Sequence, residues 1–168
     1  GHSPHAPSPS AGSADNFLAV AFPDDQVQVL PYHRLVKDLN GKSPATLLAE
    51  LRARFEFTSG PPQPVHKGHV GLYLDGSWQT FVLPSFTGAS SLENLDCNIL
   101  QEKVLTPLLG IGDPRTDQRI DFVGGIRGTQ ELEKRVDAGE AAVAFAMYPV
   151  SVADLFAVSD AGEIMPPK

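Results

Sequence analysis

Hydrophobic and polar residues alternate in several short stretches of the first half of the chain, and this alternation predicts strands. Residues 17–22 (FLAVAF) are continuously apolar, and residues 26–30 (QVQVL) place Val27 and Val29 on one face. Pro23 separates these two segments and favours a turn, so they are predicted to pair as a hairpin. Residues 69–83 alternate on both sides of Asp75-Gly76, a dipeptide favoured in two-residue hairpin turns, which predicts a second hairpin.

Two helices are predicted between and after these hairpins. The first begins at Ser43 and Pro44, because serine is a good N-cap and proline is tolerated at the first helical position. Its leucines recur at helical spacing as far as Phe55, so one face is apolar. The second is predicted over residues 95–110 with Asp96 as its cap. Pro107 is expected to kink or shorten that helix, because proline has no N–H to donate.

The second half of the chain predicts two strands that alternate with two helices. These are, in order, a strand at residues 119–123 (RIDFV), a helix at 129–139, a strand at 141–149 and a helix at 151–162. The second strand is apolar on both faces, which is typical of a strand in the middle of a sheet. Ser151 and Asp154 have the spacing of a capping box at the start of the last helix.

This order of elements predicts an α/β or α+β fold in a single domain with a mixed sheet, made of two hairpins and then a βαβα unit, flanked by helices. The strands at 119–123 and 141–148 are expected to be parallel neighbours, because the helix between them is long enough for a crossover. Residues 1–16 are rich in Pro, Ser, Gly and Ala and are interpreted as a disordered arm or tag remnant. Residues 17–168 are interpreted as the C-terminal α/β domain of a larger protein.

Composition narrows the classes of function. The 168 residues carry a formal net charge of −7, which argues against nucleic acid or an anionic membrane surface as a partner. No apolar run reaches the length of a membrane span. The single cysteine cannot form an internal disulfide, so a reducing, cytoplasmic location is expected.

The strongest candidate for chemistry is the segment DPRTDQRIDFVGGIRG, residues 113–128. If the predicted strand and helix are placed correctly, its glycines lie where a strand leads into a helix N-terminus, a location that favours phosphate or carboxylate. The predicted anion-contacting loop is Gly124, Gly125, Arg127 and Gly128, with Arg115 and Arg119 as electrostatic support. The alternative is that the glycines only permit positive φ angles and that the charges form an exposed set of ion pairs.

Other residues give weaker indications. His66 and His69 are close together, but no further potential metal ligands accompany them. His33 lies beside Arg34, and Cys97 lies near a predicted helix start without a nearby histidine. No catalytic residue and no metal site is therefore predicted.

Several strings taken together resemble a known family. FLAVAFPDDQVQVLPYHRLVKDLNG, LYLDGSWQ, DPRTDQRIDFVGGIRG and the segment from residue 139 to 168 are similar to the C-terminal half of the bacterial and archaeal domain-of-unknown-function 1015 family. Two positions differ from the family's usual residue: His33 stands where Asn is usual, and Gln118 where Lys is usual. In that family an upstream half carries a D-G-H-H-R type motif, which resembles that of ParB/sulfiredoxin-type folds, including kinases that act on free serine.

The resemblance and the glycine loop together suggest an anion-, phosphate- or nucleotide-binding C-terminal domain of a phosphotransferase-like parent. The expected ligand is a small anion, and a nucleotide is the cofactor expected of the parent protein. The present chain lacks the upstream motif, so it is not expected to be an enzyme by itself. The alternative is a structural domain that packs against the upstream half or against a second copy in a homodimer.

Overall fold

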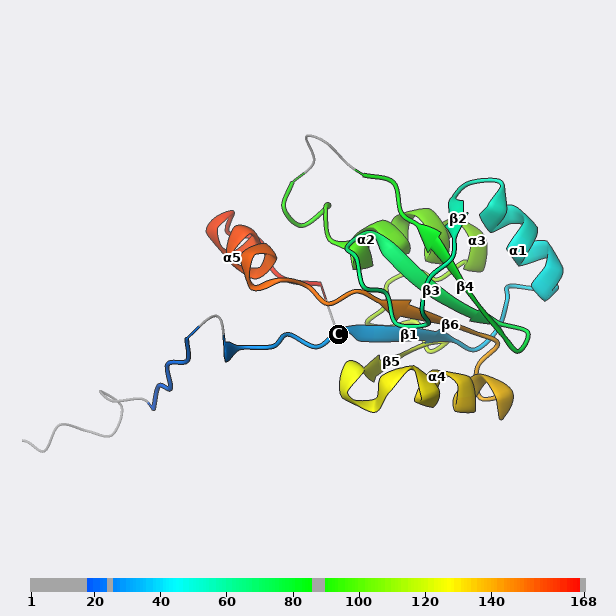
Figure 1. The fold of residues 1–168 in the computed structure, drawn as a ribbon. Coiled ribbons are helices and arrows are strands. Elements are labelled where there is room, and N and C mark those ends of the chain that lie inside the picture. Colours follow the sequence, from blue (N-terminus) through cyan, green and yellow to red (C-terminus); the bar gives the residue numbers. More distant parts are fainter. Residues whose placement is uncertain (1–17, 24–25, 86–89, 167–168) are drawn as a thin grey trace, which may run out of the picture.

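Six strands form one sheet in the order β2-β4-β3-β6-β1-β5, and every neighbouring pair is antiparallel (Figure 1). The computed structural model describes residues 18–23, 26–85 and 90–166. The strands in these residues are β1 (Tyr32–Val36), β2 (Glu56–Thr58), β3 (His69–Leu74), β4 (Ser77–Val82), β5 (Ile120–Gly124) and β6 (Val143–Met147). Together with the helices they make a single α+β domain.

Helices cover both faces of the sheet. The helical elements are α1 (Pro44–Arg52), α2 (Asp96–Leu100), the π-helical turn η3 (Gln101–Leu105), α3 (Thr106–Leu109), the 3-10 turn η4 (Gly125–Arg127), α4 (Gly128–Asp137) and α5 (Val152–Asp160). Figure 1 shows α1, α2 and α3 on one face and α4 on the other, with α5 beyond the end of the sheet near the start of β1.

The single domain was predicted correctly, but the mixed sheet was not, since it is antiparallel throughout. The predicted hairpin of residues 17–30 is also wrong: in its described part, residues 18–23 and 26–30, no strand forms. The start of that segment runs away from the domain (Figure 1). Leu18, Val20 and Phe22 are exposed there, whereas residues 28–30, nearer to β1, line a cavity of the domain. Its alternation therefore has no partner strand among the described residues.

The predicted parallel pair is wrong in a specific way. β5 and β6 run parallel to each other, but β1 lies between them and pairs antiparallel with both. β1 was not predicted as a strand, because Pro31 precedes it and its first residues, Tyr32, His33 and Arg34, show no apolar alternation. The crossover through α4 therefore passes over one intervening strand.

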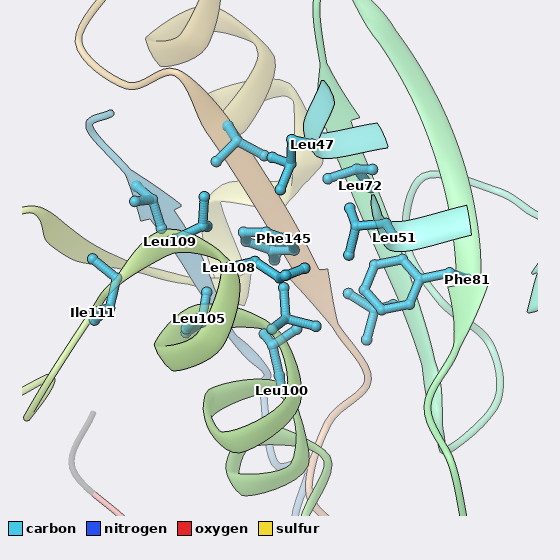
Figure 2. Packing of buried hydrophobic residues seen from close by; sticks show 14 of the residues in the cluster. Leu47, Leu51, Leu72, Phe81, Leu100, Leu105, Leu108, Leu109, Ile111 and Phe145 are labelled. Atoms are coloured by element: carbon cyan, nitrogen blue, oxygen red, sulfur yellow. The ribbon is translucent and has the colours of Figure 1, made fainter. Parts of the chain in front are cut away.

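The main core lies between the sheet and the helices α1 to α3. Leu47 and Leu51 of α1 are fully buried there beside Phe81 of β4 and Phe145 of β6 (Figure 2). The continuous helix predicted over residues 95–110 is instead three short elements. Thr106 N–H bonds the Gln101 carbonyl, which makes one π-helical turn immediately before the proline of α3.

A smaller cluster on the opposite face packs under α4. Two polar groups of the hairpin anchor that helix: the Tyr73 hydroxyl donates to Asp137 (2.9 Å) and Trp78 Nε1 donates to Glu133 (2.6 Å). Part of this face is covered by the proline-rich segment before β3, whose Pro62 carbonyl lies against Gly71 of that strand. Gln63 Nε2 donates to the Met147 carbonyl and holds that segment against β6 (2.9 Å).

The predicted hairpin turn and the two predicted serine caps are confirmed. Asp75 and Gly76 both have positive φ and close the β3–β4 hairpin. Ser43 caps α1, and Ser151 and Asp154 form the capping box of α5. Asp96 does not cap its own helix, however. Its carboxylate accepts a hydrogen bond from the Gly68 amide of another loop (2.8 Å).

Candidate functional site

The predicted glycine loop forms a tight turn between β5 and α4. The Gly125 amide already donates to the Pro31 carbonyl (2.7 Å), and a Cβ at Gly125 would approach Pro31 to 2.6 Å. Gly128 has a φ of 68° and its amide donates to the Gly125 carbonyl. Arg127 is largely exposed and lies 3.9 Å from the Glu131 carboxylate. Three cavities of the described residues, including the two at Arg34 described below, are not lined by this loop.

The two supporting arginines lie at the other end of β5, so the six predicted residues do not come together. Arg119 donates to the carbonyls of Leu109 and Gly110 and pairs with Asp117 (3.0 Å), and these contacts fix the loop after α3. Arg115 lies on a turn, 3.8 Å from Asp113, and its side chain faces a cavity. The same cavity is also lined by Arg34 of β1.

Arg34 of β1 is the unusual residue of this domain. It lies on the same face of the strand as Val36, the face that packs on the main core, and only 8% of it is exposed. Nη1 donates to the Tyr32 carbonyl (2.5 Å), and the guanidinium carbon lies 5.6 Å from the Phe122 ring centroid. Within the described residues no carboxylate comes within 4.0 Å of it. A buried guanidinium normally has such a partner.

Two cavities meet at this guanidinium, with volumes of about 480 and 310 Å³. Both are lined by Arg34, Cys97, Met165 and Pro166, so the two cavities adjoin one another at these residues. The larger one also contains residues from the segment before β1, from the loop after β6 and from α5. The smaller one includes Arg115 at its rim. Arg115 is therefore the one predicted residue that shares a cavity with Arg34.

The electrostatics at this junction follow from burial. Burial lowers the pKa of the Arg34 guanidinium, and the adjacent Cys97 sulfur partly offsets that effect. The group remains protonated, as arginine does in proteins. Burial likewise raises the pKa of the Cys97 thiol, while the Arg34 charge opposes the shift. We call the two adjoining cavities together the Arg34 cleft. A cation, Arg34, therefore lies beside a thiol, Cys97, in the wall that the two cavities share.

His33, the residue before Arg34, points to the opposite face and has a structural role. Its side chain is fully buried, and Nδ1 accepts a hydrogen bond from the Met147 amide (3.1 Å). Burial, and secondarily the charge of Arg34, lowers its pKa from 6.5 to about 4, so the ring is neutral at pH 7. Nε2 is buried and has no hydrogen-bond partner in the described part of the chain.

Sequence reasoning did not identify Arg34 as a site residue. The signal that could have found it is parity along the strand, because Arg34 is two residues from Val36, a core position. Reading residues 32–36 as a strand would have placed a charge facing the interior. That strand was not predicted, because Pro31 and His33 interrupt the apolar alternation by which a strand is recognised.

The described residues contain neither a cluster of potential metal ligands nor a membrane-spanning helix. The rings of His66 and His69 lie 5.5 Å apart, and the described residues contain no group of three or more potential metal ligands. Within the same residues no helix has the length and apolarity needed to span a bilayer.

The fold and the cleft define an α+β domain with a buried arginine that faces two cavities. A scan of family models matches residues 2–98 to DUF1015, described as a protein of unknown function, and the chain belongs to that family. The match contains the strings noted between residues 17 and 41 and between 72 and 79, and it ends before the glycine loop. The searches of curated proteins and of solved structures found no match.

Proposed function

We propose that this domain binds a small anion in the cleft floored by Arg34. The observation that carries the proposal is Arg34, a residue only 8% exposed, which lines two cavities and has no carboxylate partner in the described residues. A buried charge without a counterion is costly to the folded state. An anion with two oxygens, such as phosphate or a carboxylate, offsets that cost by accepting two parallel hydrogen bonds from arginine.

The roles proposed for the candidate residues change accordingly. Gly124, Gly125, Arg127 and Gly128 stay a predicted anion loop, but the exposed Arg127 side chain already has Glu131 beside it. Arg115 lies at the rim of the smaller cavity, where it would assist Arg34. A nucleotide is one anion that carries the required phosphate. Phosphotransfer in a larger parent protein also stays a proposal.

Inorganic phosphate is expected to stabilise the wild-type chain against urea and heat, by about 1.4 kcal/mol at ten times its dissociation constant. Arg34→Met should abolish this stabilisation, because methionine fills a similar volume without the charge. Arg127→Met is the matched control and should leave it unchanged. The measurement is urea unfolding with and without phosphate at constant ionic strength.

The outcomes distinguish the two locations. Loss of the phosphate effect in Arg127→Met but not in Arg34→Met would move the site to the glycine loop. No stabilisation of the wild-type chain at millimolar phosphate would overturn anion binding itself. Circular dichroism of each variant verifies that it is folded before the comparison is made.

A second candidate function is packing against another chain, either a second copy or the upstream half that the family resemblance implies. The observation that favours it is the extended segment before β1, in which Leu18 is 92%, Val20 67% and Phe22 70% exposed. Apolar side chains gathered on one segment are typical of an interaction surface.

This second function predicts self-association of the purified chain that weakens in the double variant Val20→Asp/Phe22→Asp. Ile126→Asp removes an exposed apolar residue elsewhere and is the matched control. Light scattering over a range of concentrations measures the mass. A monomer at all concentrations, together with no capture of a co-expressed upstream half, would rule the interaction out.

A further inference from the structure

We infer that the ligand of the Arg34 cleft is an amphipathic organic anion: its negative group contacts the guanidinium, and its apolar body fills the larger cavity. This inference rests on the proposed anion binding and adds the chemical class of the ligand. It comes from the difference between the two cavities that meet at Arg34.

The larger cavity has the size and the lining of a site for an organic molecule. Its volume of about 480 Å³ lies within the range of roughly 300–1,000 Å³ that is typical of small-molecule sites. Four separate segments supply its aliphatic walls, and the side chains concerned are Val29, Leu30, Leu95, Met147, Val150 and Leu155. Such walls favour hydrocarbon over a sugar or an amide.

The other charged groups in this lining already have partners. Lys67 and Asp154 form an ion pair with an N···O distance of 2.6 Å. The Asp96 carboxylate accepts a hydrogen bond from the Gly68 amide and is 8% exposed. Arg34 is therefore the charge in this cavity that a ligand can neutralise, and one anionic group is sufficient.

The smaller cavity is less suited to a polar ligand body, because its amides are engaged. Asn98 Nδ2 donates to the Leu92 carbonyl (2.7 Å). Gln101 Nε2 lies within hydrogen-bond distance of the carbonyls of Ile111 and Gly112 (3.1 and 3.0 Å). A ligand with a polar body would compete with these bonds, whereas hydrocarbon in the larger cavity displaces none.

Cys97 provides a local reporter of occupancy. It is the only cysteine of the chain, and it lines both cavities beside Arg34. A ligand held against the guanidinium would shield the thiol from a small neutral alkylating reagent. The rate of Cys97 alkylation by iodoacetamide therefore measures binding at this site and not elsewhere on the surface.

The experiment compares protection of Cys97 by acetate, hexanoate, octanoate, 1-hexanol, inorganic phosphate and AMP, at one pH and ionic strength. Half-protection by the carboxylates is expected at concentrations that fall by up to about fourfold per added methylene, since each buried methylene contributes to binding. Hexanol should need at least about tenfold more than hexanoate, because it lacks the charge. Arg34→Met should remove the preference for hexanoate over hexanol.

Leu155→Asp tests the apolar body separately, because this half-buried residue of α5 lines only the larger cavity. In that variant the dependence on chain length should disappear while protection by phosphate persists. Arg54→Met, at an exposed arginine that lines neither cavity, serves as the control and should behave as the wild type.

Three results would overturn the inference. Equal protection by acetate and octanoate, both dependent on Arg34, would leave anion binding intact and remove the apolar body. Stronger protection by AMP than by octanoate would assign a ligand with a polar body. No protection by any anion, with no phosphate stabilisation, would refute the proposed function together with this inference.

Discussion

Gly71→Ala is expected to destabilise the domain by about 3 kcal/mol or more, the upper end of what overpacking in a core costs. Gly71 lies in β3 between β4 and β6, and a Cβ built there would lie 2.2 Å from the Pro62 carbonyl oxygen and 3.2 Å from Ala146 Cβ. β3 cannot retreat because it is paired on both sides. The proline-rich segment would have to lift from the sheet, and Gln63 holds it to β6.

Urea unfolding measures this effect, and Gly76→Ala is the matched control. Gly76 has a φ of 73° and open space around it, so its substitution tests only backbone conformation, at about 1–2 kcal/mol. A Gly71→Ala variant no less stable than Gly76→Ala would show that the segment before β3 is easily displaced.

Acid is expected to weaken the fold through His33. Its pKa is about 4 in the folded protein and 6.5 in an unfolded chain, so the folded state favours the neutral ring. This contribution is fully present above pH 6.5, and it is lost as the pH falls from 6.5 to about 4. The difference between the two pKa values corresponds to about 3 kcal/mol.

His33→Asn isolates this contribution, because the asparagine Oδ1 can accept from the Met147 amide in place of Nδ1 but does not titrate. The free energy of unfolding of the wild type should decline between pH 6.5 and 4.5 relative to that of the variant. Exposed His66→Asn is the control, and its curve should follow that of the wild type. Parallel curves for the wild type and His33→Asn would contradict the prediction.

Local chemistry could be predicted from this sequence, whereas long-range pairing could not. The Asp75-Gly76 turn and the capping box of Ser151 depend on residues close in sequence, and both are confirmed. The position of β1 in the sheet depends on partner strands more than 80 residues away. The sequence of residues 32–36 does not specify which strands these are. An antiparallel pair and a parallel crossover are compatible with the same apolar pattern, which explains why the sheet was predicted as mixed.

The candidate site was missed for the same reason. The glycine loop was selected because its chemistry is visible in consecutive residues. Arg34 is a buried charge that lines two cavities only because three segments distant in sequence pack together. These segments are β1, α2 and the residues after α5. Such a site becomes recognisable once the strand that carries it has been identified.

The position of β1 between β5 and β6 also bears on how the chain folds during synthesis. When a ribosome has released the first hundred residues, β2, β3 and β4 can pair, but β1 has no neighbour to bind. Its two partners are made last, and loop closure over such separations is slow. The family-matched portion, residues 2–98, contains β1 but neither of its partner strands, so β1 can pair only after β5 and β6 have been synthesised.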